Sequence, residues 1–544
     1  MAEKIVSIIG GGPAGLYAAR LMKLRRPDWS VTVHERSTHD DSFGFGVSLT
    51  GRALASFRQA DEESHQEILA LGVAAPSAEF RLPTGTVRIP GFSRGVAVAR
   101  RDLLGLLVRL CRASGVDLRE GSTADVDELR RHSDIVVVAD GAGSPSRSRL
   151  REELGVRESF ARDAFIWCAA EVPLDAATFV PIETEHGVYA THSYPYTSTM
   201  SGHVIEASLE TVQAAGMSVG PRADGGSDMV ALEYLSEVFS EILKGQPLIG
   251  NRSVWGRFRW VSCERWHHDR VVVIGDAAAT AHMSLGSGTK HAMESAISLA
   301  DALVAEDSVP DAFARYEQWQ RPATAELQDR SFRSSLWWQS IDRRLDLAPS
   351  RLAVSYLTRA GAMSLDKLLA SAGGLTTDAA TAVGGGATPP DLDPAAFERW
   401  VLERPLSVRQ DVELARRLIG PDTSDVVTVA GEREAREQRH LRPGAVVLVD
   451  LTVDTGDAWG DEAAAVVTRA RACLAAGADG VRLVGKPTRD ALLDRLALAE
   501  RIRTTTRATV AVSGPDEHRT DLVEGLLAGR LDLVEFPDRE GEVR

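Results

Sequence analysis

The chain begins with a short apolar segment that runs directly into a glycine-rich turn and then into a helix. Residues 5–9, IVSII, are mostly apolar, as in a strand buried on both faces, and the turn GGGPAG follows at residues 10–15. A second strand is expected at residues 31–34. Because two parallel strands joined by a helix form a right-handed βαβ unit, the sequence predicts an α/β fold with a doubly wound sheet.

The residues of this turn have separate tasks. Gly10 permits the tight turn, Gly12 lets backbone N–H groups approach a pyrophosphate, and Gly15 lets the helix pack closely on the strand. The helix N-terminus at Pro13 and Ala14 supplies partial positive charge. Together they predict a binding site for a dinucleotide cofactor.

Acidic residues are expected at the carboxyl ends of the neighbouring strands. Glu35 lies 20 residues after Gly15, where a carboxylate can bind both ribose hydroxyls, and the adjacent Arg36 is a further candidate. Asp140 follows a strand at residues 135–139 and begins the segment DGAGSPSR. These positions lie at the sheet edge where ligands bind.

A third motif follows a strand at residues 271–274. Gly275 and Asp276 end this strand, so the carboxylate can accept hydrogen bonds from a ribityl hydroxyl. The start of the next helix can bring its backbone amides to the N1–C2=O edge of a flavin ring. The candidates there are Gly286, Ser287, Gly288 and Thr289.

Composition excludes several classes of protein. The formal charge of −15 argues against an electrostatic nucleic-acid binder. No apolar run approaches the roughly 18 residues of a membrane span, and the N-terminus does not resemble a signal peptide. Four cysteines without zinc-ligand or CxxC spacing are expected to be reduced and mostly buried, and no metal site is predicted. We therefore expect a cytoplasmic protein.

In this order the three motifs resemble the single-component FAD-dependent aromatic monooxygenases of the 4-hydroxybenzoate hydroxylase type. The family's Arg-x-x-Leu, which opens a helix and reaches FAD, is matched by Arg100 and Leu103, with the adjacent Arg101 as an alternative candidate. The string GDAAATAHMSLGSGTKHAMESAISLADAL resembles a subgroup of hydroxylases. That subgroup includes salicylyl-CoA 5-hydroxylase, the monooxygenase half of 2-aminobenzoyl-CoA monooxygenase/reductase, and the violacein-pathway indole monooxygenase.

The resemblance implies non-covalent FAD, NAD(P)H and O₂ as co-substrates, and hydroxylation of an activated ring through a flavin C4a-hydroperoxide. The expected substrate is an ortho-hydroxy- or ortho-aminobenzoyl thioester such as salicylyl-CoA. The alternatives are a hydroxylase of a free indole or other biosynthetic arene, and a flavin reductase that makes no oxygenated product. A homo-oligomer is compatible with the sequence.

The chain is expected to divide into a monooxygenase and a smaller module. An FAD-binding and helical part should comprise residues 1–154 and 263–370, with an antiparallel substrate sheet inserted at residues 155–262. The Gly- and Pro-containing residues 371–394 read as a flexible linker. Residues 395–544 alternate strands and helices and resemble a truncated half of a βα-barrel without a cofactor.

Three residues are candidates for direct action on the substrate. His282 lies in the loop between Asp276 and the glycine pair, where it could relay a proton. His192 and Tyr196 lie on the substrate sheet and could line the aryl pocket. Each has a structural alternative, as a loop histidine or as sheet packing.

Arginines of the late helical region could receive the phosphates of a CoA carrier, although helical arginines are usually solvated. The candidates are Arg330, Arg333, Arg343 and Arg344.

Overall fold

The computed structural model describes residues 3–38, 44–91, 95–390, 393–420, 423–453 and 455–537. The chain forms two compact units. The first comprises residues 1–81 and 90–342, and the second comprises residues 82–89 and 343–544.

A six-stranded sheet forms the centre of the first unit. Its order is β15-β16-β9-β1-β2-β8, and all neighbours are parallel except β15 and β16. The strands are β15 (His267–His268), β16 (Val271–Val273), β9 (Ile135–Val138), β1 (Ile5–Ile9), β2 (Ser30–Glu35) and β8 (Asp117–Glu120). This confirms the α/β fold and places the three predicted motifs at the ends of β1, β9 and β16.

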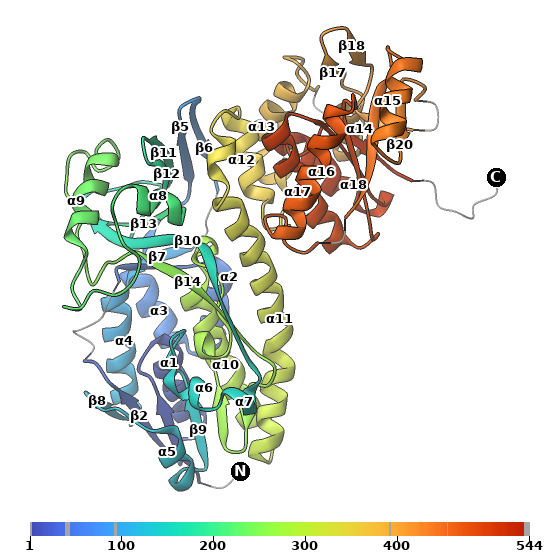
Figure 1. Ribbon diagram of the computed structural model, residues 1–544. Helices are drawn as coiled ribbons and strands as arrows, with labels where there is room; N and C mark the ends of the chain where they lie inside the picture. The colour runs from blue at the N-terminus through green and yellow to red at the C-terminus, as the bar shows by residue number, and fades with distance from the viewer. Residues whose placement is uncertain are drawn as a thin grey trace. The chain divides into compact units, whose positions relative to one another are not determined.

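Helices complete the core around this sheet. In Figure 1, α1 and α10 lie side by side, and α4 and α11 flank them. The apolar side chains of β1, β9 and β16 are buried, apart from the exposed Ile5, and they pack with those of α1, α4 and α10 in one cluster. The helices are α1 (Pro13–Arg25), α2 (Gly51–Ala60), α3 (Glu62–Leu71), α4 (Arg100–Ala113), α5 (Val126–His132), α6 (Pro145–Arg149), α7 (Arg151–Leu154), α10 (Gly288–Ala305) and α11 (Val309–Trp338).

A mainly antiparallel sheet is inserted into this unit. Its strands follow the order β14-β10-β13-β12-β11, and β5 (Ala78–Leu82) pairs in parallel with β11. The strands are β10 (Val156–Ala170), β11 (Ala177–Thr184), β12 (Gly187–Pro195), β13 (Ser201–Ala207) and β14 (Gly256–Cys263). The place of β5 in this sheet was not predicted, because its pairing partner is about 100 residues away in the chain.

One face of the inserted sheet is covered by α8 (Leu209–Ala214) and α9 (Met229–Val238). Side chains such as Ile166, Tyr189 and Ile205 form a hydrophobic core on that face. A small sheet of β3 (Gly46–Leu49), β7 (Val96–Ala99) and β4 (Val73–Ala74) completes the unit. Alternation along the strands therefore leaves the opposite face of the inserted sheet to carry other side chains.

The second unit is a parallel sheet with the order β19-β24-β23-β22-β21-β20. The strands are β19 (Leu418–Ile419), β20 (Val426–Val429), β21 (Val446–Thr452), β22 (Gly480–Val484), β23 (Thr509–Ser513) and β24 (Leu533–Glu535). The helices are α15 (Glu432–Leu441), α16 (Asp461–Ala475), α17 (Arg489–Thr506) and α18 (Arg519–Ala528). The predicted alternation from β21 to β24 is confirmed, whereas β19 and β20 were not predicted.

The flexible linker expected at residues 371–394 is wrong over its first half. Helix α13 (Leu365–Val383) occupies it, and a non-helical Ala372 beside two glycines bends this helix. Leu375, Ala379 and Val383 are buried, so apolar spacing outweighs the low helix propensity of glycine. Residues 391–392 lie outside the described residues. The unit also contains β6 (Gly85–Ile89), α12 (Pro349–Thr358), α14 (Pro394–Leu402), β17 (Leu406–Arg409) and β18 (Val412–Leu414).

All four cysteines are free and buried, as the sequence predicts. Among the described residues, no helix is both long and apolar enough to cross a membrane.

Candidate functional site

The glycine turn after β1 has the geometry that the sequence predicts. Gly10 has a φ of +106°, and a Cβ there would stand 2.5 Å from the carbonyl oxygen of Ala139. A Cβ on Gly15 would stand 2.0 Å from the Gly10 carbonyl oxygen. A Cβ on Gly12, in contrast, would meet nothing within 4 Å. The turn is therefore closed toward the sheet and open at the N-terminus of α1, where a pyrophosphate can bind.

Small residues bring the first motif against the third. Pro13 begins α1 with the φ that a first helical turn requires, and Ala14 is buried behind it. Gly275 has a φ of +57°, and a Cβ there would stand 3.3 Å from the Cβ atoms of Ala14 and Ala292. The N-terminus of α1 and the end of β16 thus adjoin each other.

Glu35 is fixed beside the turn by two backbone groups. The N–H of Gly11 donates to Oε2 at 2.6 Å, and the N–H of Ser37 donates to Oε1 at 2.8 Å. Its carboxylate therefore lies at the end of β2, within reach of a ribose that binds across the turn. The adjacent Arg36 is exposed, and its contact with a cofactor stays a prediction.

The second motif combines an incompletely satisfied carboxylate with a buried arginine. Asp140 Oδ2 accepts the N–H of Ser146 at 3.2 Å, whereas Oδ1 is buried without a hydrogen-bond partner among the described residues. Arg147 is fully buried and donates to the carbonyl oxygens of Ala142 and Ala277. Arg147 therefore ties this loop to the third motif, while Asp140 retains an oxygen for a ligand.

Asp276 lies in an electrostatically coupled position. Burial raises the pKa of its carboxyl group to about 6, while the guanidinium groups of Arg100 and Arg147 act in the opposite direction. Burial likewise lowers the pKa of Arg100, against the attraction of Asp276 and Glu35. In the sequence, Arg100 is a candidate only because it matches a family motif. The electrostatic interaction with Asp276 and Glu35 indicates that it lies near both carboxylates.

The start of α10 provides a second open helix N-terminus. Gly286 has a φ of +59°, and Ser287 forms the N-cap position with a buried Oγ that has no partner among the described residues. Gly288 and Thr289 begin the helix, and a Cβ on Gly288 would meet nothing within 4 Å. Unpartnered buried oxygens and open glycines at two helix N-termini fit a dinucleotide with a ring system.

His282 is buried in the loop before α10. Its Nδ1 accepts the N–H of Ser284 at 3.3 Å, so the remaining proton is assigned to Nε2. The ring lies 4.7 Å from that of Phe258 and 5.8 Å from that of Trp260, between centroids. Burial lowers the pKa of His282 to about 4, and the imidazole is neutral at pH 7.

The other two substrate candidates lie on β12 and directly after it. His192 on β12 is buried, and its Nε2 lies 3.1 Å from Oε1 of Glu206 on β13. Tyr196 instead packs with Ala97 and Ala169. It also lies against Gly46, where an added Cβ would stand 2.4 Å from the Cβ of Tyr196. Sequence reasoning missed Glu206. The available sequence signal was the spacing of two residues along β13, which places Gly202, Val204 and Glu206 on the same face of the strand.

The arginines suggested for a carrier's phosphates are already engaged. Arg344 is buried and pairs with both oxygens of Glu500, at 2.7 and 2.6 Å, which excludes a surface role. Arg333 pairs with Asp329, Arg330 pairs with Glu326, and Arg343 donates to Thr505. The expectation for Arg344 is therefore wrong, whereas a phosphate contact by Arg330, Arg333 or Arg343 stays a prediction.

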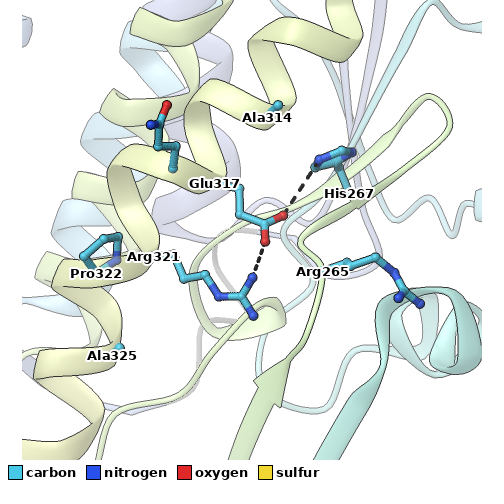
Figure 2. A pocket seen from close by; sticks show the side chains of 8 residues that line it. Arg265, His267, Ala314, Glu317, Arg321, Pro322 and Ala325 are labelled. Atoms are coloured by element: carbon cyan, nitrogen blue, oxygen red, sulfur yellow. Dashed lines mark hydrogen bonds and ion pairs between the residues drawn. The ribbon is translucent and has the colours of Figure 1, made fainter.

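Figure 2 shows a separate hollow beside α11. Glu317 points between Arg321 and His267, forming an ion pair with Arg321 and lying 3.8 Å from His267 Nε2. The hollow contains none of the predicted cofactor or substrate residues. We assign it no role in the site.

Comparison with known proteins agrees with this geometry. Residues 116–331 match the family described as "FAD binding domain". Over 360 residues the chain is 37% identical to a salicyloyl-CoA 5-hydroxylase of Streptomyces sp, covering 65% of this chain and 69% of that protein. The chain belongs to the FAD-dependent aromatic monooxygenases.

Two further comparisons extend the family assignment. The monooxygenase is 33% identical over 359 residues to the 3-hydroxy-4-methyl-anthranilyl-[aryl-carrier protein] 5-monooxygenase of Streptosporangium sibiricum, covering 66% of this chain and 95% of the relative. The structure of 2-methyl-3-hydroxypyridine-5-carboxylic acid oxygenase covers 66% of this chain and 96% of its own, with a TM-score of 0.52 at 20% identity, and it supports the fold alone. The monooxygenase therefore binds FAD, and NAD(P)H is the co-substrate typical of the family.

Proposed function

We propose that this monooxygenase hydroxylates an ortho-hydroxy- or ortho-aminobenzoyl group held as a thioester, such as salicylyl-CoA. Each turnover would consume the arene, NAD(P)H, a proton and O₂, and would yield the hydroxylated arene, NAD(P)⁺ and water. The 37% sequence identity with salicyloyl-CoA 5-hydroxylase is the observation that carries this proposal. The alignment of 360 residues is long enough to include both the cofactor residues and the inserted sheet.

The cofactor residues would act through position and charge. Glu35, Asp140 and Asp276 would accept hydrogen bonds from FAD hydroxyls, and Arg100 would offset its phosphate charge. Bound FAD supplies the hydride acceptance and oxygen activation, which no amino-acid side chain provides. The backbone amides at Gly288 and Thr289 would face the flavin ring.

The substrate would lie between the His282 loop and the inserted sheet. Buried aromatic side chains there, including Trp338 and Phe179, would exclude water from the reacting ring. We retain His282, His192 and Tyr196 as residues of this pocket. His282 would donate its Nε2–H, since the neutral imidazole has no proton on Nδ1.

We propose that the C-terminal sheet is a truncated βα-barrel that binds no flavin. The sheet has six parallel strands, fewer than the eight of a closed barrel. The β17–β18 hairpin packs apolar side chains, including Val412 and Leu414, against Leu448 and Leu533 of the sheet. In such a truncated barrel, this hairpin would cover apolar side chains of the sheet that further strands would otherwise bury.

The function is tested by comparing salicylyl-CoA with free salicylate. We expect NAD(P)H oxidation coupled to a product 16 mass units heavier (the mass of one oxygen atom) for the thioester, and little for the free acid. Equal turnover of free salicylate would contradict the thioester preference. NAD(P)H oxidation without an oxygenated product, or turnover of free indoles alone, would favour one of the alternative activities.

A further inference from the structure

The face of the inserted sheet that lies opposite its α8–α9 core carries a buried histidine–glutamate pair. In the register of β12 and β13, Glu206 stands opposite Ala190 and His192 stands opposite Val204. Residues two apart on a strand share a face, so His192 and Glu206 are diagonal neighbours on one face. His192 is 9% exposed and Glu206 is 5% exposed. Nε2 of His192 and Oε1 of Glu206 lie 3.1 Å apart, a close electrostatic contact whose alignment falls short of a hydrogen bond.

Electrostatic interaction links this pair to the loop that adjoins the cofactor site. The carboxylate of Glu206 raises the pKa of His282 and His192 lowers it, so both groups act on the buried His282 side chain. The imidazole of His192 also packs on Trp338, with ring centroids 3.9 Å apart, and on Phe179 at 5.6 Å. A histidine–carboxylate pair thus lies among aromatic side chains at the position expected for the substrate.

A carboxylate next to one imidazole nitrogen decides what the other nitrogen can do. The nitrogen that faces the carboxylate holds the proton, so the opposite nitrogen carries a lone pair and accepts hydrogen bonds. Because the Glu206 carboxylate lies 3.1 Å from Nε2, its negative charge favours a proton on that nitrogen; we therefore assign the proton of His192 to Nε2, which makes Nδ1 an acceptor. No hydrogen bond to Nδ1 of His192 is found within the part of the chain that the structure describes.

We propose that Nδ1 of His192 binds the activating hydroxyl or amino group of the substrate ring, and that Glu206 is a positioning residue that fixes the tautomer of His192. This inference rests on the proposed function and deepens it, since it specifies a ring that carries a hydrogen-bond donor. A ring without that donor leaves a buried acceptor unsatisfied and binds more weakly.

Equilibrium binding to the oxidised FAD holoenzyme tests the pair without turnover and without a thioester. The probes are 2-hydroxybenzamide and benzamide, which differ in one hydroxyl group, and binding is followed through the change in flavin absorbance. We expect the parent to bind 2-hydroxybenzamide about 10-fold more tightly, as one neutral hydrogen bond allows. His192→Phe should abolish this preference, and His192→Gln, which retains an acceptor, should restore part of it.

Glu206→Gln separates positioning from packing. The amide has the same shape but can donate to Nε2, which allows the tautomer with the proton on Nδ1. We expect the preference for the hydroxyl group to fall to about 2-fold or less, with FAD content unchanged. Glu183→Gln, an exposed glutamate on the neighbouring strand β11, is the matched control and should retain the full preference.

The result that overturns the proposal is a hydroxyl preference that survives in His192→Phe, or a parent enzyme that shows none. A preference retained in Glu206→Gln overturns the positioning role. Failure of the proposed function is distinguishable, because it would appear as absent turnover of aryl thioesters while the binding preference and its loss in the variants persist.

Discussion

Replacing Asp276 with asparagine should make the apoprotein more stable and should weaken the binding of FAD. Burial raises the pKa of Asp276 from its ordinary 3.8 to about 6, although Arg100 and Arg147 oppose that rise. At pH 7 the ionised carboxylate therefore lowers the free energy of unfolding. A shift of about two pKa units corresponds to about 3 kcal/mol. Because a buried asparagine amide also needs partners, we expect a gain in unfolding free energy of about 1–2 kcal/mol.

The pH dependence gives this prediction its sign. The folded protein binds the proton more tightly than the unfolded chain, so the contribution of Asp276 to stability is highest below pH 3.8 and falls as pH rises through 6. The gain in unfolding free energy of Asp276→Asn over the parent should reach its maximum above pH 7 and should decrease below pH 6. Urea denaturation of both apoproteins between pH 5 and pH 8 measures it.

FAD binding should respond in the opposite direction. Loss of a charge-assisted hydrogen bond costs about 1.5–3 kcal/mol, which raises the Kd for FAD about 10- to 150-fold. Quenching of FAD fluorescence on titration with apoprotein measures that Kd, and Asp307→Asn, at an exposed acidic residue, is the control. A variant that binds FAD like the parent, or an apoprotein destabilised at every pH, would refute the reasoning.

Three further predictions follow from close contacts and from the second unit. Gly15→Ala should lower both the Tm of the apoprotein and the FAD content of the protein, because the added Cβ would stand 2.0 Å from a backbone oxygen. Gly12→Ala, where the Cβ meets no protein atom within 4 Å, should lower the FAD content alone. Equal Tm losses in the two variants would contradict this contrast. Arg344→Met should cost about 3–5 kcal/mol by leaving the buried Glu500 without its partner, as urea denaturation would show, and Glu500→Leu in the same chain should recover much of the loss. Chromatography of cofactors released by denaturation should yield FAD without equimolar FMN, and an equimolar FMN peak would show that residues 395–544 bind a flavin.

The elements that could be predicted from sequence are those with short-range causes. The strand, turn and helix at the N-terminus depend on apolar runs and on glycines that adopt φ values closed to other residues, as Gly10 does. The same holds for β21 to β24, where buried parallel strands alternate with helices. Each of these signals lies within about 30 residues, so the chain itself carries it.

Predictions that required a tertiary environment were less successful. Arg344 reads as an exposed basic residue in the sequence, yet it forms a buried pair with Glu500, 156 residues away. The linker prediction failed over residues 371–383 because Leu375 and Val383 are buried in a helix, which composition alone does not reveal. Burial is set by the packing partners, and these are distant in the chain.

The sequence by itself determined that this chain binds a dinucleotide, because the requirement for glycine at the turn after β1 is steric and local. Only the tertiary structure decided how the site is assembled. Arg147 reaches Ala277 across 130 residues, and Glu206 meets His192 only through the register of two strands. Register is set by long-range strand pairing and by which face is buried, so the partners of a buried charge become known only when the sheet has formed.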